Sequence, residues 1–347
     1  MPNLDDLRGH LKRVEAIGSS GSMIHSLITT DVGPAGSRIA AGRIDAVLRT
    51  MHHEMLVSDE LFELICGLPE EDLDESWRRI IRTLKRQIEL EKPIPSDLVE
   101  RISKHSTQAN NTWTRARETK DFGSFAPDLE SMVSLQREKA ACYGDRFRTP
   151  YDALIAGYDS DLTVDFLDPL FAEAGDFLVS LMERVKEKPQ PRDDFLRGQF
   201  NHAEQLEVSK ILLETIGMGL SNTLFVTATH PLTNGIVGGG LVLISTRTTD
   251  FLPDSTLATI HEGGHGLLEL FIKEPYTQLG NITGLSMSVH ESTSRFWENH
   301  VGRSRGFTRY LLKLFKSRFP LKFADVDENM LFKALNDVKP GLIRVNA

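Results

Sequence analysis

The stretch that decides the architecture of this chain is His261-Glu262-Gly263-Gly264-His265, an H-E-x-x-H pattern inside a strongly apolar segment. Residues four positions apart lie on the same face of a helix. Two imidazoles at that spacing can reach a single Zn²⁺, and the glutamate beside the first can accept a proton from water. The pattern therefore predicts a buried helix that carries His261 and His265 as metal ligands and Glu262 as a general base.

Gly263 and Gly264 stand between the two histidines. A glycine in a helix interior costs about 1 kcal/mol relative to alanine. A sequence that places two of them side by side predicts a close approach to the helix backbone. We expect that approach to come from a substrate or from a strand.

A catalytic zinc site needs a third protein ligand and one open position, and the candidates are Glu269, Glu291 and Glu298. Glu269 follows His265 by one turn, so it would form a near-linear row with the two histidines. We interpret it as a surface carboxylate or one that contacts a ligand. Glu291 and Glu298 share one face of the next helix, so geometry alone barely separates them. The neighbouring His290 favours Glu291, because its imidazole could donate a hydrogen bond to a substrate or to a developing oxyanion.

Helical periodicity dominates the remaining sequence, which predicts a mainly α fold. The expected helices cover residues 4–18, 37–56, 59–67, 74–92, 96–118, 127–142, 163–187, 202–217, 255–272, 286–302 and 308–319. The first of them is expected to stop near Gly18 to Gly21.

Between residues 223 and 247 the helical periodicity gives way to short apolar, β-branched stretches. Two short β-branched stretches predict a small β-hairpin or sheet edge, with the glycine-rich residues 235–240 between them as a flexible connection. No repeat or linker divides the sequence. The prediction is one helical domain over residues 1–347, with the zinc-site helices at about 255–302.

The composition is that of a soluble globular protein, with 40% hydrophobic and 26% charged residues among 347. The net charge of −9, without a basic patch, disfavours a nucleic-acid partner. No apolar run approaches the roughly 18 residues of a membrane span, and no secretory signal is recognisable at the N-terminus. With only two widely separated cysteines, the sequence predicts a cytoplasmic protein that binds no membrane.

Beyond the motif, residues 289–304, which contain His290-Glu291-Ser292, closely resemble the carboxypeptidase Taq family of zinc metallocarboxypeptidases. The similarity extends over essentially the whole chain. Further matching segments in the family's order are residues 113–117, 121–125, 151–154, 196–198, 229–235, 244–247 and 340–345.

The resemblance implies a largely helical fold with a central cleft, and a homodimer that removes single amino acids from peptide substrates with a free C-terminus. It makes Glu291 the third ligand, for one zinc ion per subunit, although Co²⁺ and Mn²⁺ suit similar ligands. It also places His230 near the metal. Arg344 is a candidate for binding the substrate's C-terminal carboxylate, a task that suits the forked donors of arginine.

Several positions depart from the family pattern. Leu232 and Thr293 replace a phenylalanine and a glutamine, and residues 241–245 lack the aspartate and arginine of a family motif. Family members also continue beyond the position of Ala347, so we expect this chain to be C-terminally truncated. The alternative function is therefore a zinc-binding but catalytically impaired protein that acts through its interfaces. A weaker option is a zinc oligopeptidase that cuts internally.

Overall fold

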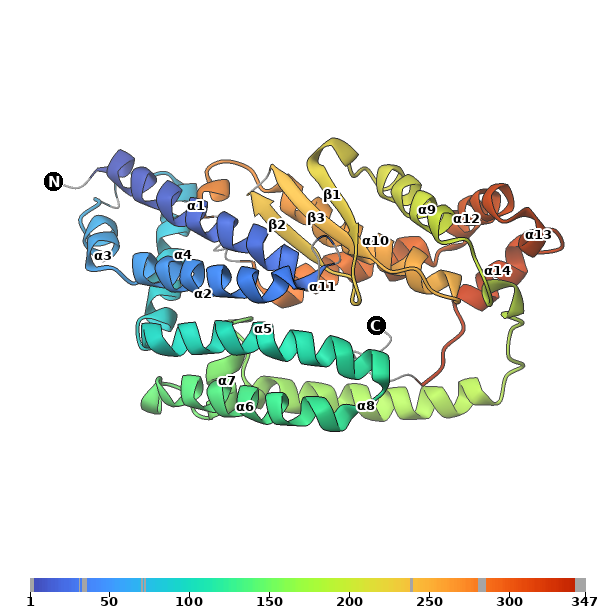
Figure 1. Cartoon of the computed structure of the whole chain (residues 1–347), viewed down its shortest axis with the longest axis horizontal. Coiled ribbons are helices and arrows are strands. Elements are labelled where there is room, and N and C mark those ends of the chain that lie inside the picture. Colours follow the sequence, from blue (N-terminus) through green and yellow to red (C-terminus); the bar gives the residue numbers. More distant parts are fainter. Residues whose placement is uncertain are drawn as a thin grey trace. The chain divides into compact units, whose positions relative to one another are not determined.

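A computed structural model of the chain describes residues 3–340, except residues 31, 33–35, 70, 72, 238, 239 and 280–284. Helices form most of the described chain, and one small sheet accompanies them (Figure 1). The predicted mainly α class is confirmed. None of the described helices combines the length and the apolar character that crossing a membrane requires.

The chain divides into two compact units. Unit 1 comprises Met1–Leu162, Asn234–Leu243 and Glu269–Ser288, and unit 2 comprises Thr163–Thr233, Ile244–Leu268 and Val289–Ala347. Because the chain passes between the units several times, no single cut in the sequence separates them. The interpretation as one domain over residues 1–347 stays a prediction.

Unit 1 is built mainly from helices, several of which begin at a polar cap. Its helices are α1 (Leu4–Thr29), α2 (Ser37–Leu56), α3 (Asp59–Cys66), α4 (Glu75–Glu91), α5 (Ser96–Thr119), α6 (Phe122–Ala141) and α7 (Pro150–Ile155). Asn3, Ser58 and Asp74 accept hydrogen bonds from the free N–H groups at the starts of α1, α3 and α4. Helices α1, α2, α5 and α6 each pack against the next (Figure 1).

The expectation that the first helix stops near Gly18 is wrong, since α1 continues to Thr29. These glycines do not end the helix; they allow α2 to pack closely against α1. A Cβ on Gly18 would lie 3.2 Å from the His52 ring, and one on Gly21 would lie 3.8 Å from Leu48. Glycine has a low helix propensity, and packing against α2 provides the stabilisation that keeps this part of α1 helical.

An aromatic and aliphatic core in unit 2 is surrounded by α9 (His202–Thr215), α12 (Arg305–Arg318), α13 (Pro320–Phe323) and α14 (Glu328–Leu335). Helix α8 (Val164–Lys186), whose residues are all described, also belongs to this unit but has no buried residue. The core includes the buried side chains Phe195, Leu212, Leu252, Ile260, Phe315, Phe323 and Leu331. Leu252 and Ile260 belong to α10 (Leu252–Phe271), the helix that carries the H-E-x-x-H pattern, so this core anchors the motif.

The sheet has three strands, β1 (Thr223–Thr227), β2 (Thr233–Val237) and β3 (Leu241–Thr246), in the order β1-β3-β2. The predicted small β element is confirmed, but the glycine-rich stretch is not only a connection, because strand β2 occupies part of it. Gly235 lies within β2, where an added Cβ would stand 2.6 Å from the Glu269 carboxylate. This glycine thus makes room for a neighbouring side chain.

We predict that Gly42→Ala destabilises unit 1. A Cβ at this position of α2 would lie 2.4 Å from Thr107 Cγ2 of α5. Overpacking of this kind costs about 1–3 kcal/mol. The midpoint of urea unfolding, followed by circular dichroism, measures the loss.

The matched control is Gly9→Ala in α1, where no heavy atom lies within 4 Å of an added Cβ. This change should stabilise the protein by roughly 0.5–1 kcal/mol through helix propensity. Equal shifts for both variants would contradict the packing role of Gly42.

Candidate metal centre

A chain of buried hydroxyl groups holds α10 in place within unit 2. Thr259 Oγ1 lies 2.9 Å from Ser209 Oγ of α9 and 3.0 Å from Thr246 Oγ1 of β3. All three side chains are fully buried. Because an unpaired buried hydroxyl is costly, this chain fixes the register of α10 against its neighbours.

The two motif glycines let neighbouring helices reach the backbone of α10. A Cβ on Gly263 would lie 2.5 Å from Ile216 Cδ1 at the end of α9. One on Gly264 would lie 2.8 Å from the Cα of Ser294 in α11 (Met287–Arg295). The expectation of a substrate or a strand at these glycines is wrong, because side chains and backbone of other helices fill the space. The gap left by Gly264 brings α11 close enough to join the site.

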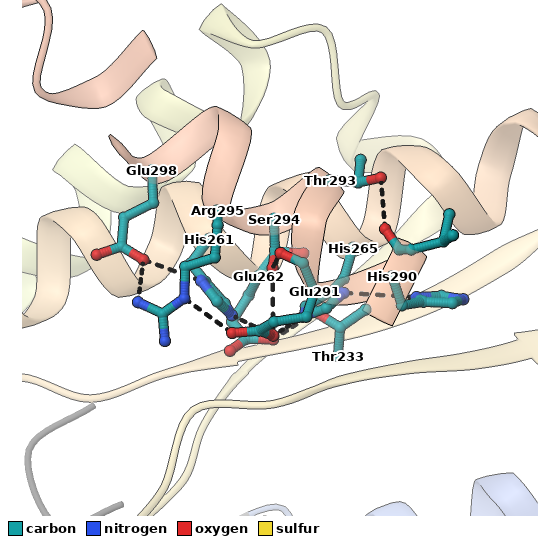
Figure 2. A network of polar contacts seen from close by, with 11 residues as sticks. Thr233, His261, Glu262, His265, His290, Glu291, Thr293, Ser294, Arg295 and Glu298 are labelled. Carbon is teal, nitrogen blue, oxygen red and sulfur yellow. Dashed lines mark hydrogen bonds and ion pairs between the residues drawn. The ribbon is translucent and has the colours of Figure 1, made fainter. Parts of the chain in front are cut away.

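His261, His265 and Glu291 come together at this contact between α10 and α11 (Figure 2). The Nε2 atoms of both histidines lie 3.5 Å from Glu291 Oε2, and the three ligand atoms are all within 4.8 Å of one another. In the part of the chain that the structure describes, this is the group of side chains suited to hold a metal ion. Two imidazole nitrogens and one carboxylate oxygen are a typical donor set for catalytic zinc.

The second ring nitrogen of each histidine has its own partner. His261 Nδ1 lies 3.0 Å from Glu298 Oε2, and His265 Nδ1 lies 3.4 Å from His290 Nδ1. When Nδ1–H of His261 donates to Glu298, the lone pair of Nε2 is directed toward a metal, as is usual for metal-bound histidines. Glu298, the alternative third ligand, therefore lies behind His261, and Glu291 lies in front.

The charges of the donor set suit a divalent cation. Burial and the neighbouring His261 lower the pKa of His265 to about 4, so this ring is neutral and has a lone pair for a metal. Burial raises the pKa of Glu291, but His261 and Arg295 outweigh it, and the net pKa is lowered. Burial lowers the pKa of His261, but the bond to Glu298 and the surrounding carboxylates outweigh it, and the net pKa is raised. Positive charge is thus stabilised at this point, and a metal would compete with the proton on His261.

Glu262 points to the same site from a buried position, with 7% of its surface exposed. Burial raises the pKa of its carboxyl to about 7. The Thr233 hydroxyl lies 2.8 Å from Glu262 Oε2 and also 2.8 Å from the backbone oxygen of Glu262 (Figure 2). A hydroxyl in this place can donate to an ionised carboxylate or accept from a protonated one.

The sequence did not predict Thr233 as a residue of the site, although Thr233 lies inside the family-like segment 229–235. Its position on β2, far from the motif in the sequence, gave no local signal. His290 does lie against the site, through His265. His230 is half-buried between β1 and β2, and its place near a metal stays a prediction. Arg344 lies outside the described residues.

Comparison with known proteins agrees with this geometry. The sequence profile of the carboxypeptidase Taq (M32) metallopeptidase family matches residues 6–347. Carboxypeptidase 1 of Bacillus subtilis is 28% identical over 340 residues, which cover 97% of this chain and 68% of that protein. Thermostable carboxypeptidase 1 of Pyrococcus furiosus is 30% identical over 347 residues, with 97% and 68% covered.

A solved structure shows the same fold. The crystal structure of the M32 carboxypeptidase from Deinococcus radiodurans R1 matches with a TM-score of 0.87 at 29% identity, over 99% of this chain and 69% of that one. The resemblance that the sequence motifs indicate is thereby confirmed. The chain belongs to the carboxypeptidase Taq (M32) family of metallopeptidases.

Proposed function

We propose that this metallocarboxypeptidase binds one zinc ion per subunit through His261, His265 and Glu291 and removes single amino acids from peptides with a free C-terminus. The observation that carries the proposal is the meeting of three ligand atoms within 4.8 Å of one another beside the buried Glu262. The family and the carboxypeptidase relatives support the reaction class. They do not favour the alternative of a catalytically impaired protein.

When bound, a zinc ion polarises the scissile carbonyl and lowers the pKa of a water molecule toward about 7. His261 and His265 would hold the ion through Nε2, and Glu291 through Oε2. Cobalt and manganese suit similar ligands; zinc is proposed because two imidazoles and one carboxylate are a typical donor set for a catalytic zinc.

Glu262 is the general base in this proposal. Its pKa of about 7 matches a group that must accept a proton and then release it near neutral pH. We assign the acceptance of the proton to Oε1, because Thr233 holds Oε2. Thr233 keeps the carboxyl in place in both protonation states, since Oε2 carries no proton in either state and accepts from the hydroxyl. The proton then passes from Glu262 to the leaving amine.

Three residues are proposed to contact the substrate. His290 and His230 would donate to the carbonyl region, and Arg344 would bind the C-terminal carboxylate through its forked donors. We further propose a cytoplasmic homodimer, as the family resemblance and the scarcity of cysteines suggest.

We predict that Glu291→Ala removes stoichiometric zinc, whereas Glu298→Ala weakens binding by about 10–100-fold, as is typical for a group that orients a ligand. Titration against a chromogenic chelator measures both affinities. The control is Glu328→Ala, which removes a carboxylate that pairs with Arg309 outside the metal centre. This variant should leave zinc affinity unchanged. A stronger loss for Glu298→Ala than for Glu291→Ala would reverse the ligand assignment.

Glu262→Gln should retain the metal and lower kcat by about 10²–10⁴-fold, because an amide cannot accept the proton. Release of the C-terminal amino acid from a short peptide measures kcat, and metal analysis of the same sample measures occupancy. Glu269→Gln, about two turns further along α10, is the matched control and should behave as the parent. Parental turnover by the Glu262 variant would rule out this carboxylate as the base.

The substrate class has its own test. A peptide with a free C-terminus should be shortened one residue at a time, and the same peptide with a C-terminal amide should resist, because it lacks the carboxylate that an arginine fork would bind. Mass spectrometry of the products distinguishes the two. Removal of the metal with a chelator should stop the reaction, and added Zn²⁺ should restore it. Internal fragments from the amidated peptide would favour an oligopeptidase instead.

A further inference from the structure

Arg295, the last residue of α11, connects two carboxylates of the site with one guanidinium group (Figure 2). Its Nε lies 2.8 Å from Glu291 Oε1, and its Nη1 lies 3.0 Å from Glu298 Oε2. Arg295 follows Glu291 by four residues and precedes Glu298 by three. On a helical face this spacing places the guanidinium between the two acids.

The two bonds act on different parts of the metal centre. On Glu291, Arg295 holds Oε1, and the opposite oxygen Oε2 is the one that faces His261 and His265. On Glu298, it holds Oε2, the oxygen that also accepts from His261 Nδ1. Arg295 therefore constrains the proposed ligand Glu291 directly, and it constrains the proposed ligand His261 through Glu298.

Glu298 is held from the other side as well. It lies in the π-helical segment Phe296–Gly302 that follows α11, and its Oε1 is 3.3 Å from Arg303 Nη2. Glu298 is largely buried, with 11% of its side chain exposed. Within the described part of the chain, Arg303 pairs with Glu298 and not with Glu291, so Arg295 is the side chain that links the two acids.

We propose that Arg295 is a positioning residue of the metal centre, which turns Glu291 Oε2 toward the two histidines and steadies Glu298 behind His261. This role rests on the proposed metal ligands. A lysine could not replace the arginine, because its single ammonium nitrogen contacts one carboxylate at a time, whereas the planar guanidinium reaches both.

A purely structural role fits the contact poorly. The side chains of Arg295 and Glu291 are 45% and 46% exposed, and ion pairs with that much solvent contribute little to folding stability. Loss of a group that orients a metal ligand, in contrast, typically weakens metal binding by about 10–100-fold. The expected effect thus falls on the metal and spares the fold.

The test compares the full chain with Arg295→Gln and Arg295→Lys. Zinc affinity, from competition with a chromogenic chelator, should fall by about 10–100-fold in Arg295→Gln and remain clearly below the parent in Arg295→Lys. The visible spectrum of the Co²⁺-loaded protein should change in Arg295→Gln, since the band positions report ligand geometry. The unfolding midpoint of the metal-free protein should stay at the parental value.

Arg309→Gln is the matched control, because Arg309 makes a similarly exposed two-bonded contact with Glu328, a residue outside the metal centre. It should retain parental zinc affinity. Unchanged zinc affinity and spectrum in Arg295→Gln would overturn the proposal, and full affinity in Arg295→Lys would show that charge alone suffices. A parent protein that binds no zinc would instead overturn the ligand assignment, so the two failures are distinguishable.

Discussion

The burial of a helix that carries His261, Glu262 and His265 is the constraint on which the site depends. Polar groups removed from water must find partners, or folding loses several kcal/mol for each. The site meets this demand with a carboxylate behind one histidine, a second imidazole behind the other, and a hydroxyl on the glutamate. These partners come from α11, the segment after it and β2, which explains why distant parts of the sequence meet at α10.

Close packing makes these partnerships geometrically possible. Gly264 brings the backbone of α11 to α10, and Gly263 admits Ile216 from the end of α9. Gly266 does the same for Ile244 of β3, whose Cδ1 would lie 2.9 Å from an added Cβ. A helix lined by three such contacts has little freedom to shift. This rigidity suits a metal centre, in which ligand atoms must be held within a fraction of an ångström.

The electrostatics of the site follow from the same arrangement. Glu262, Glu291 and Glu298 gather around His261, and Arg295 and Arg303 offset part of this negative charge. Burial acts against ionisation of all three acids, yet it prevails only at Glu262, which has no arginine beside it and whose pKa is raised. The two arginine-linked acids keep lowered pKa values and stay ionised. The structure thus separates a carboxyl suited to proton transfer from two suited to a cation.

The sequence alone determined the mainly α class, the motif helix, the family and the candidates around it, because helical spacing is local and H-E-x-x-H carries its geometry within five residues. It favoured Glu291 over Glu298 as a ligand through His290 and the family resemblance, but it could not place Thr233 or Arg295 at the site. It misread Gly18 and Gly235, and at Gly263 and Gly264 it predicted a close approach but not the neighbouring helices that make it. Only the tertiary structure decided these points, since which oxygen faces which nitrogen depends on how close two helices pack, and that distance is not a property of either segment by itself.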